Sequence, residues 1–217
     1  MRSSGGRSIV AKLGSKGLHE WMVLLDSLWP RFKSKFYYPF IFGSFGKSSV
    51  MFRPVYIGNP KYIHIGERVL IRPGVRLETV VLNPDRPPEL RIGSDVNIEQ
   101  DVHIVAVGKI NIHDGVSLTA RSSLLCGNHP FFDIHDPRSI GCRVEGEDSF
   151  IEIGEGSFLG IGCNIQMNVR IGKHVVVGSN SVVKRSVPDY CVVNGNPAEV
   201  VLQFNVEEQR WSRPKKA

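Results

Sequence analysis

Aliphatic residues recur every six positions along most of this chain, and this spacing is its dominant pattern. Three runs of this spacing begin at Ile65, Ile92 and Ile112. The longest run has no break and comprises Ile153, Leu159, Ile165, Ile171, Val177 and Val183. A period of six fits neither one face of an α-helix nor a long strand. It is typical of short strands joined by tight turns and stacked as the coils of a parallel β-helix.

Each hexad has a second regular position, four residues after the aliphatic one, that holds a small or β-branched residue such as Val69, Ser157 or Cys163. Glycine often follows the aliphatic residue directly, as at Gly66 and Gly154. We expect the aliphatic side chain to point inward, the small one to fit near a corner and the glycine to permit the turn. Three hexads then make one three-sided coil, and the runs predict five coils.

Three irregular gaps interrupt the pattern, at residues 77–92, 104–112 and 124–153. Each gap falls between complete coils, so all three insertions should leave the prism at the same corner. Loops that project from a rigid scaffold are common places for binding and catalytic residues. The longest gap begins with the stretch LLCGNHPFFDIHDPR and contains His129.

The first 50 residues lack the hexad pattern. An amphipathic helical stripe is formed there by Leu18, Trp21, Met22, Leu25, Leu28, Trp29 and Phe32. Pro30 should kink or end this helix. We therefore divide the chain into an N-terminal helical extension (1–50), a β-helix domain (51–203) and a C-terminal tail (204–217).

The apolar stripe is too large to remain in water, so it needs a cover. One cover is the chain's own prism or a neighbouring subunit. The other is a membrane surface, to which Arg31, Lys33 and Lys35 would be attracted if its lipids are anionic. The pattern alone leaves both open.

Composition and charge narrow the function classes. The chain has 217 residues and a formal net charge of +6, which suits an anionic partner. No cluster of basic and aromatic residues of the kind that stacks bases stands out, so nucleic acid is not expected as a partner. No apolar run is long enough to span a membrane. The four cysteines have no CxxC spacing and no signal peptide is recognisable, which predicts free thiols in a cytoplasmic protein, peripheral at the inner membrane face if the helix binds lipid.

Two stretches carry a resemblance to a known family. One is GNHPFFDIHDPR at residues 127–138, and the other is VVVGSNSVVKRSVPDYCVVNGNPAEVV at residues 175–201. From about residue 57 to 201 the chain resembles the hexapeptide-repeat acyltransferases, especially the galactoside, maltose and nodulation-factor acetyltransferases. The resemblance implies a left-handed β-helix, acetyl-CoA as donor, a hydroxyl or amine acceptor, and a homotrimer with active sites between neighbouring prisms. The N-terminal extension resembles those of acetyltransferases of surface-polysaccharide synthesis (O-antigen, capsule or exopolysaccharide).

The same resemblance implies roles for particular residues. His129 takes the catalytic position, and Lys184 and Arg185 fall near the phosphates of the coenzyme. Backbone groups that line the pantetheine arm correspond to Gly160, Gly162, Gly178 and Ser179. An ungapped count places Glu99 where the galactoside branch has an asparagine that helps to hold the acceptor, so the same sugar is not expected. Asn128, beside the histidine, is a second candidate acceptor contact.

Acetyl transfer from a thioester needs a nucleophile that loses its proton as it attacks. A sugar hydroxyl is a very weak acid, but a positioned imidazole, with an ordinary pKa near 6.5, can take the proton in the transition state. The simpler interpretation of His129 is a loop histidine bonded to a carbonyl. An orienting carboxylate for it could be any of Asp133, Asp136, Glu99 and Asp101.

Other nucleophile and metal chemistries are weaker predictions. Cys126 lies three residues from His129 and could act as a nucleophile, but packing is the more ordinary role of a thiol there. Histidines at a subunit interface of a β-helix would resemble the γ-class carbonic anhydrases. The candidates His64, His103, His113, His135 and His174 do not match that ligand pattern, so no metal is expected.

The sequence therefore predicts an O-acetyltransferase that acts on a saccharide or glycan precursor. An N-acetyltransferase of an amino sugar or small amine is the nearest alternative, because the geometry at His129 would be the same. A non-catalytic β-helix scaffold is the alternative from a different class.

Overall fold

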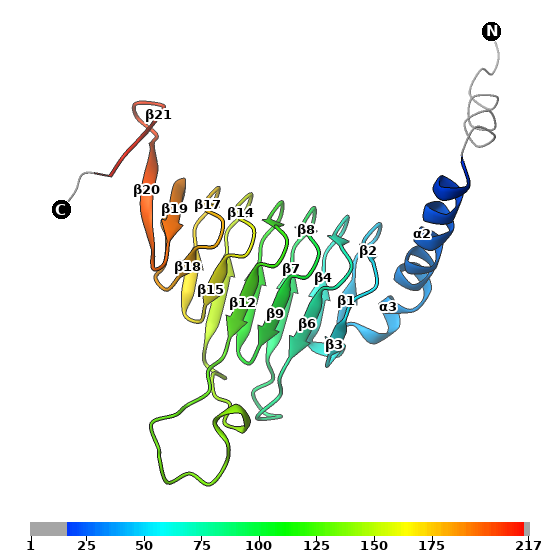
Figure 1. Cartoon of the computed structure of the whole chain (residues 1–217), viewed down its shortest axis with the longest axis horizontal. Helices are drawn as coiled ribbons and strands as arrows, with labels where there is room; N and C mark the ends of the chain where they lie inside the picture. Colours follow the sequence, from blue (N-terminus) through cyan, green and yellow to red (C-terminus); the bar gives the residue numbers. More distant parts are fainter. Residues whose placement is uncertain (1–16, 215–217) are drawn as a thin grey trace.

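The computed structural model describes residues 17–214 as two helices followed by a prism of parallel strands and a C-terminal hairpin (Figure 1). The helices are α2 (Leu18–Phe36) and α3 (Tyr38–Ile41). The outer ends of the predicted extension and tail lie outside the described residues.

Three parallel sheets form the sides of the prism, and each coil adds one strand to each sheet. Sheet A contains β1 (Ser44–Phe45), β4 (Ile63–Ile65), β7 (Glu89–Ile92), β10 (Lys109–Ile112), β13 (Phe150–Ile153) and β16 (Val169–Ile171). Sheet B contains β2 (Val50–Met51), β5 (Leu70–Ile71), β8 (Asn97–Ile98), β11 (Ser117–Leu118), β14 (Phe158–Leu159) and β17 (Val176–Val177). Sheet C contains β3 (Tyr56–Gly58), β6 (Arg76–Thr79), β9 (His103–Ala106), β12 (Ser123–Cys126), β15 (Asn164–Gln166) and β18 (Val182–Val183).

Sheet B is extended at the C-terminal end of the prism. Strand β19 (Cys191–Gly195) continues it in parallel, and β20 (Ala198–Asn205) and β21 (Arg210–Ser212) add antiparallel strands. Two short 3-10 helices, Pro60–Tyr62 and Ile140–Cys142, lie in connections between sheets C and A. Strand β20 crosses the predicted start of the tail at residue 204, so the β-structure extends further than expected.

The hexad pattern gives the core directly. The aliphatic residues that begin the coils stack in register down sheet A. Each pairs with the next in the order Ile65, Ile92, Ile112, Ile153 and Ile171. All five are buried. Each coil therefore covers the apolar layer of the next, which is how a β-helix of short strands obtains a continuous core.

The described residues form six coils, where the sequence predicted five. The additional coil is β1–β3 and begins at Ser44, inside the range expected to be helical extension. Its inward residues are Phe45, Met51 and Ile57, which keep the spacing of six. A search for aliphatic repeats missed this coil because an aromatic residue and a methionine occupy two of its three core positions.

The insertions leave the prism at one edge, as predicted. The connections 80–88, 107–108 and 127–149 all run from a strand of sheet C to a strand of sheet A. The two longer ones project from the same side of the prism in Figure 1. We call this line the C–A edge, and the line between sheets B and C the B–C edge.

Helix α2 packs on the first coil through its small residues. Pro30 and Ser34 are buried, and the Ser34 hydroxyl accepts a hydrogen bond from the Met51 amide at 3.0 Å. Pro30 lies inside the helix and does not end it, because its missing N–H leaves only one intrahelical hydrogen bond unmade. The apolar stripe faces away from the prism, so the chain's own coils do not cover it. Within residues 17–214, no helix combines the length and apolar character needed to cross a bilayer.

Candidate functional site

The longest insertion, residues 127–149, is closed at its base by a short antiparallel bridge. The amide of Asn128 donates to the Glu145 carbonyl at 2.9 Å, and the amide of Glu145 donates to the Asn128 carbonyl at 3.0 Å. The Asn128 side chain also donates to Glu145 Oε1 at 3.1 Å. Asn128 was predicted to contact the substrate that accepts the acetyl group. Its side chain already has a structural partner, Glu145, at the base of the loop.

A buried arginine organises the rest of this loop. The Arg143 guanidinium donates hydrogen bonds to the carbonyls of Asp133, Asp136 and Arg138 at 2.7–3.0 Å. Its Nε also lies 3.4 Å from the Asp136 carboxylate. A planar group with five donors can hold several carbonyls at fixed angles, which a lysine cannot do. Nothing in the sequence pattern indicated this residue, because the loop has no periodicity.

His129 is oriented by the backbone of that same arginine. Its Nδ1 lies 2.8 Å from the Arg143 carbonyl oxygen. A carbonyl can only accept a hydrogen bond, so Nδ1 carries the proton. In the neutral ring Nε2 then has its lone pair free, and no residue in the described part of the chain bonds to it. The bond to a carbonyl is the one that the simpler interpretation of a loop histidine predicted, and it also leaves the ring in the tautomer that a general base requires.

No carboxylate orients His129 within the described chain. Asp133 Oδ1 accepts from the His135 amide, and Asp136 is engaged by Arg138 and Arg143. Hydrogen bonds from the Arg138 side chain and amide are the main causes that lower the pKa of Asp136 to about 2. Asp136 is therefore a charged anchor of the loop, and the orienting group of the histidine is a backbone carbonyl.

A cavity of about 510 Å³ lies between the base of this loop and the outer face of sheet C. His129, Asn128 and Gly141 line it from the loop. Its apolar wall consists of Val80, Val105, Val107, Leu125 and Val144. A cavity with an apolar wall and a few placed polar groups is the ordinary form of a small-molecule site.

The polar side of the cavity comes from strands β6 and β9. Arg76 Nε donates to Glu78 Oε2 at 2.9 Å, and His103 lies beside them on the same face. Burial, and secondarily the charge of Arg76, lowers the pKa of His103 below its usual value. The lowered pKa favours the neutral form of His103, which lines the same cavity as His129. Sequence reasoning considered it only as a metal candidate, although its outward position in the hexad places it on this face.

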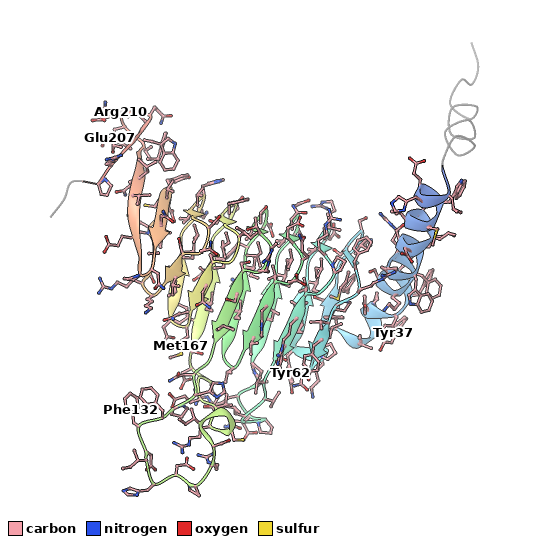
Figure 2. The ribbon with its side chains drawn as sticks, viewed as in Figure 1. Tyr37, Tyr62, Phe132, Met167, Glu207 and Arg210 are labelled. Carbon is pink, nitrogen blue, oxygen red and sulfur yellow. The ribbon has the colours of Figure 1, made fainter. Side chains whose placement is uncertain are left out.

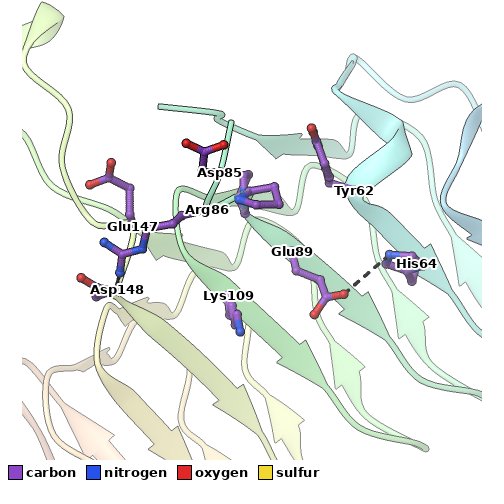
Figure 3. Close-up of a pocket in the computed structure, with 10 residues that line it drawn as sticks. Tyr62, His64, Asp85, Arg86, Glu89, Lys109, Glu147 and Asp148 are labelled. Carbon is purple, nitrogen blue, oxygen red and sulfur yellow. Dashed lines mark ion pairs between the residues drawn. The ribbon is translucent and has the colours of Figure 1, made fainter. Parts of the chain in front are cut away.

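A second cavity, of about 440 Å³, opens on the sheet A side of the same edge (Figure 3). An ion pair between Arg86 and Asp148 ties the 80–88 loop to the 127–149 loop across it. His64 Nε2 lies 3.7 Å from Glu89 Oε1 at its other end. His129 does not line this cavity, so the candidate chemistry belongs to the first.

Glu99 does not join His129 within one chain. It follows β8 and therefore lies at the B–C edge, where its carboxylate is 3.8 Å from Arg72 Nε. His129 follows β12 and lies beyond the opposite border of sheet C, and Glu99 does not line its cavity. The role of Glu99 at the acetyl acceptor therefore stays a prediction for an interface between neighbouring prisms, where the resemblance places the active site.

The residues predicted to hold the coenzyme are divided between the two edges of sheet C. Lys184 and Arg185 follow β18 at the C–A edge, the edge that carries the His129 loop. Both are exposed, and neither forms an ion pair within residues 17–214. The other four, at the B–C edge, are Gly160, Gly162, Gly178 and Ser179.

The glycines at the B–C edge have a structural reason to be there. A Cβ at Gly160 would lie 2.6 Å from the Val177 carbonyl oxygen of the next coil. A Cβ at Gly178 would lie 2.5 Å from Asn194 Oδ1. Coil stacking therefore explains both residues without a ligand. In the described part of the chain, no group of three His, Cys, Asp or Glu is arranged to hold a metal ion.

The cysteines can be ranked by reactivity, which tests the nucleophile alternative. Cys126, Cys163 and Cys191 are buried, and Cys142 is exposed. Burial raises the pKa of the Cys126 thiol, and raises that of Cys163 to about 12. We expect an aromatic disulfide reagent at pH 8 to titrate only Cys142 in the native protein, and to lose that reaction in Cys142→Ser. Recovery of an acylated Cys126 after incubation with donor would contradict this and restore Cys126 as a nucleophile.

The chain is similar to known acetyltransferases. Residues 150–185 match the family described as "Bacterial transferase hexapeptide (six repeats)". The "Putative colanic acid biosynthesis acetyltransferase WcaF" of Escherichia coli is 31% identical over 145 residues, which cover 67% of this chain and 71% of that protein. The "Putative lipopolysaccharide biosynthesis O-acetyl transferase WbbJ" of Escherichia coli is 28% identical over 165 residues, covering 74% and 81%.

The fold has solved counterparts as well. A mutant of AntD, an N-acyltransferase from Bacillus cereus solved with dTDP and coenzyme A, superimposes with a TM-score of 0.64 at 22% identity, covering 82% of this chain and 90% of that one. The predicted left-handed parallel β-helix is confirmed by the three parallel sheets and these matches. The stacked hexad coils and these matches place the chain in the class of β-helix acyltransferases. This chain belongs to the hexapeptide-repeat acyltransferase family and is an acetyltransferase.

Proposed function

We propose that this protein transfers an acetyl group from acetyl-CoA to a hydroxyl of a saccharide or glycan precursor of a surface polysaccharide, with His129 as the general base. The observation that carries this role is the hydrogen bond from His129 Nδ1 to the Arg143 carbonyl, which leaves Nε2 as the proton acceptor. The relatives WbbJ and WcaF, whose names refer to lipopolysaccharide and colanic acid biosynthesis, support the acceptor class.

In the proposed reaction the acceptor hydroxyl attacks the thioester carbonyl of acetyl-CoA while Nε2 of His129 takes its proton. The tetrahedral intermediate then collapses, the carbon–sulfur bond breaks, and the imidazolium returns the proton to the leaving CoA thiolate. The products are the acetyl ester and CoA with a free thiol, and no covalent enzyme intermediate is needed. General base catalysis contributes about 10²- to 10⁴-fold, and positioning in the cavity supplies much of the rest.

The sheet C face and its two edges form the proposed coenzyme site. In this proposal Lys184 and Arg185 attract the phosphates, and the backbone at Gly160, Gly162, Gly178 and Ser179 lines the pantetheine arm. A homotrimer completes the site, because the two edges belong to opposite borders of one sheet and a neighbouring prism can face both. Glu99 would reach an acceptor only at such an interface.

The coenzyme assignment predicts a salt-dependent affinity. Replacement of Lys184 and Arg185 together by alanine should weaken acetyl-CoA binding about tenfold or more, because two phosphate contacts are lost. The wild-type affinity should fall with added salt, and more steeply than that of the variant. Titration calorimetry at two ionic strengths measures both. Lys47→Ala with Lys61→Ala, which removes two exposed lysines elsewhere, is the control, and equal affinity in all three proteins would place the phosphates at another surface.

The function itself is tested with a panel of acceptors. Purified protein is incubated with acetyl-CoA and neutral, amino and nucleotide-linked sugars, and release of the CoA thiol is followed. Mass analysis before and after mild alkali distinguishes an ester, which is cleaved, from an amide, which is not. An ester product supports the proposal, and an amide product replaces it by the N-acetyltransferase alternative. Binding of acetyl-CoA without transfer to any acceptor, in a folded protein, would support the scaffold alternative.

A further inference from the structure

Helix α2 carries a row of exposed, large apolar side chains. On one side of the helix, the apolar side chains range from 37% exposed at Trp21 to 80% at Leu18. The remaining members are Met22, Leu25, Leu28, Trp29, Phe32 and Phe36. We call these eight residues the α2 apolar face. Val23, which is 54% exposed, lies apart from them on the opposite side. Trp29 and Phe32 stack on each other at 5.6 Å between ring centroids, so the face presents a continuous aromatic surface.

The direction of this face is fixed by how the helix docks. Ser27, Pro30 and Ser34 lie on the side that meets the first coil, and the bond from the Met51 amide to Ser34 Oγ holds them there. At about 100° per residue, the apolar face is centred opposite these residues and is roughly 120° wide. In Figure 1, α2 lies at the N-terminal end of the prism, away from β19–β21. Tyr37 follows at the junction with the prism (Figure 2).

Basic residues border the apolar face on both sides. By the same helical geometry, Lys33 lies next to Met22 at one border and Lys35 lies next to Leu28 at the other. Within residues 17–214 neither lysine has a carboxylate partner, and their ammonium groups lie near the Tyr38 and Phe36 rings. A lysine at such a border can extend its charge to a phosphate while its stem stays on apolar surface.

The acidic residues of the helix are engaged elsewhere. Glu20 accepts a hydrogen bond from the Gly17 amide at the start of the helix. Asp26 pairs with Arg53 of the first coil at 3.0 Å. Asp26 lies about 20° from Lys33 at the same border, but its charge is compensated by Arg53, so the charges bordering this face that have no partner within residues 17–214 are positive.

We infer that the α2 apolar face binds the surface of an anionic lipid bilayer, with the helix lying in the plane of the interface. A wide face with Trp, Phe and Leu between basic borders is the arrangement of interfacial helices. Charge argues against a second copy of the chain as the occupant. Packing of two such faces on each other brings basic borders together, and in a head-to-tail contact the face would meet another chain with a formal net charge of +6. An anionic surface meets both borders with opposite charge. This inference does not rest on the proposed function.

The experiment measures sedimentation of the full chain with sucrose-loaded vesicles of phosphatidylcholine alone or with about one-third phosphatidylglycerol. The wild type should pellet with the anionic vesicles and be released by salt. Trp29→Ser with Phe32→Ser should weaken binding at least about tenfold, because two large side chains no longer leave water. Lys33→Gln with Lys35→Gln should weaken binding to anionic vesicles about tenfold and leave the weak binding to neutral vesicles unchanged.

Matched controls remove the same chemistry from other places. Phe131→Ser with Phe132→Ser deletes another stacked, exposed aromatic pair, located in the 127–149 loop, where Phe132 is labelled in Figure 2. Lys47→Gln with Lys61→Gln deletes two lysines outside α2. Both should bind vesicles like the wild type, and thermal melting confirms that every variant is folded.

A second readout uses the tryptophans. The chain has three, at positions 21, 29 and 211, so Trp211→Phe leaves only those of α2 as reporters. Their emission should shift to the blue with anionic vesicles. Wild-type protein that stays in the supernatant with no emission shift would overturn the inference. A second copy would be the occupant if two results came together: the wild type does not bind vesicles, and the variant Trp29→Ser with Phe32→Ser has a lower native mass than the wild type. That outcome would also overturn the inference.

Discussion

Replacement of His129 by alanine should lower turnover by about 10²-fold or more, the usual contribution of a general base. The binding constant for acetyl-CoA should change little, because Lys184 and Arg185 are unaltered. Thermal stability should also be unchanged, since His129 is exposed and its one side-chain bond within the described chain is to the Arg143 carbonyl. Steady-state kinetics with a saturating acceptor, together with thermal melting, measures these effects.

The matched control for this variant is His135→Ala. His135 lies in the same loop and is exposed, and its backbone amide bonds to Asp133 Oδ1. Its removal should leave turnover near the wild-type value. Turnover of His129→Ala close to that of the wild type, in a folded protein, would show that another group takes the proton. His103, which lines the same cavity, would then be the next residue to replace.

The coil was predictable because one physical requirement repeats in it. Every coil must bury an aliphatic side chain at the same three places, so the sequence shows a period of six and the period gives the register. The first coil was missed because Phe45 and Met51 satisfy the same requirement with other apolar residues. The single exit edge of the insertions followed from counting hexads. Lys184 lies at this edge as well, which the pattern had not indicated.

The interior of the 127–149 loop was not predictable, because nothing in it repeats. The partner of His129 is a backbone carbonyl 14 residues away, and every residue has a carbonyl, so side-chain identity gives no signal for it. The search for an orienting carboxylate therefore led to Asp133, Asp136 and Glu99, which have other partners, and to Asp101, which lies at the B–C edge. Hexad counting also places Glu99 and His129 at different edges of one prism, because Ile98 belongs to a sheet B strand and Cys126 to a sheet C strand.

The structure points to Arg143 as the residue on which the geometry of His129 depends. Arg143→Met should reduce kcat by about tenfold to 10²-fold with a smaller change in the KM for acetyl-CoA. The loop carbonyls of Asp133, Asp136 and Arg138 lose their common donor, so the Arg143 carbonyl moves and His129 Nε2 with it. A displacement of about 1 Å at a catalytic group is enough for an effect of this size.

Because the loop lies outside the core of the prism, its disorder should be local. Hydrogen exchange within residues 127–149 should rise in Arg143→Met, while the strands of the prism keep their wild-type protection. Arg143→Lys keeps the charge but cannot hold three carbonyls, so its kcat should lie between those of the methionine variant and the wild type. Arg138→Met is the control: its exposed side chain pairs with Asp136 alone, and the carbonyl that Arg143 uses is retained. Wild-type kcat together with wild-type exchange in Arg143→Met would show that the loop is held by other contacts and that Arg143 does not position His129.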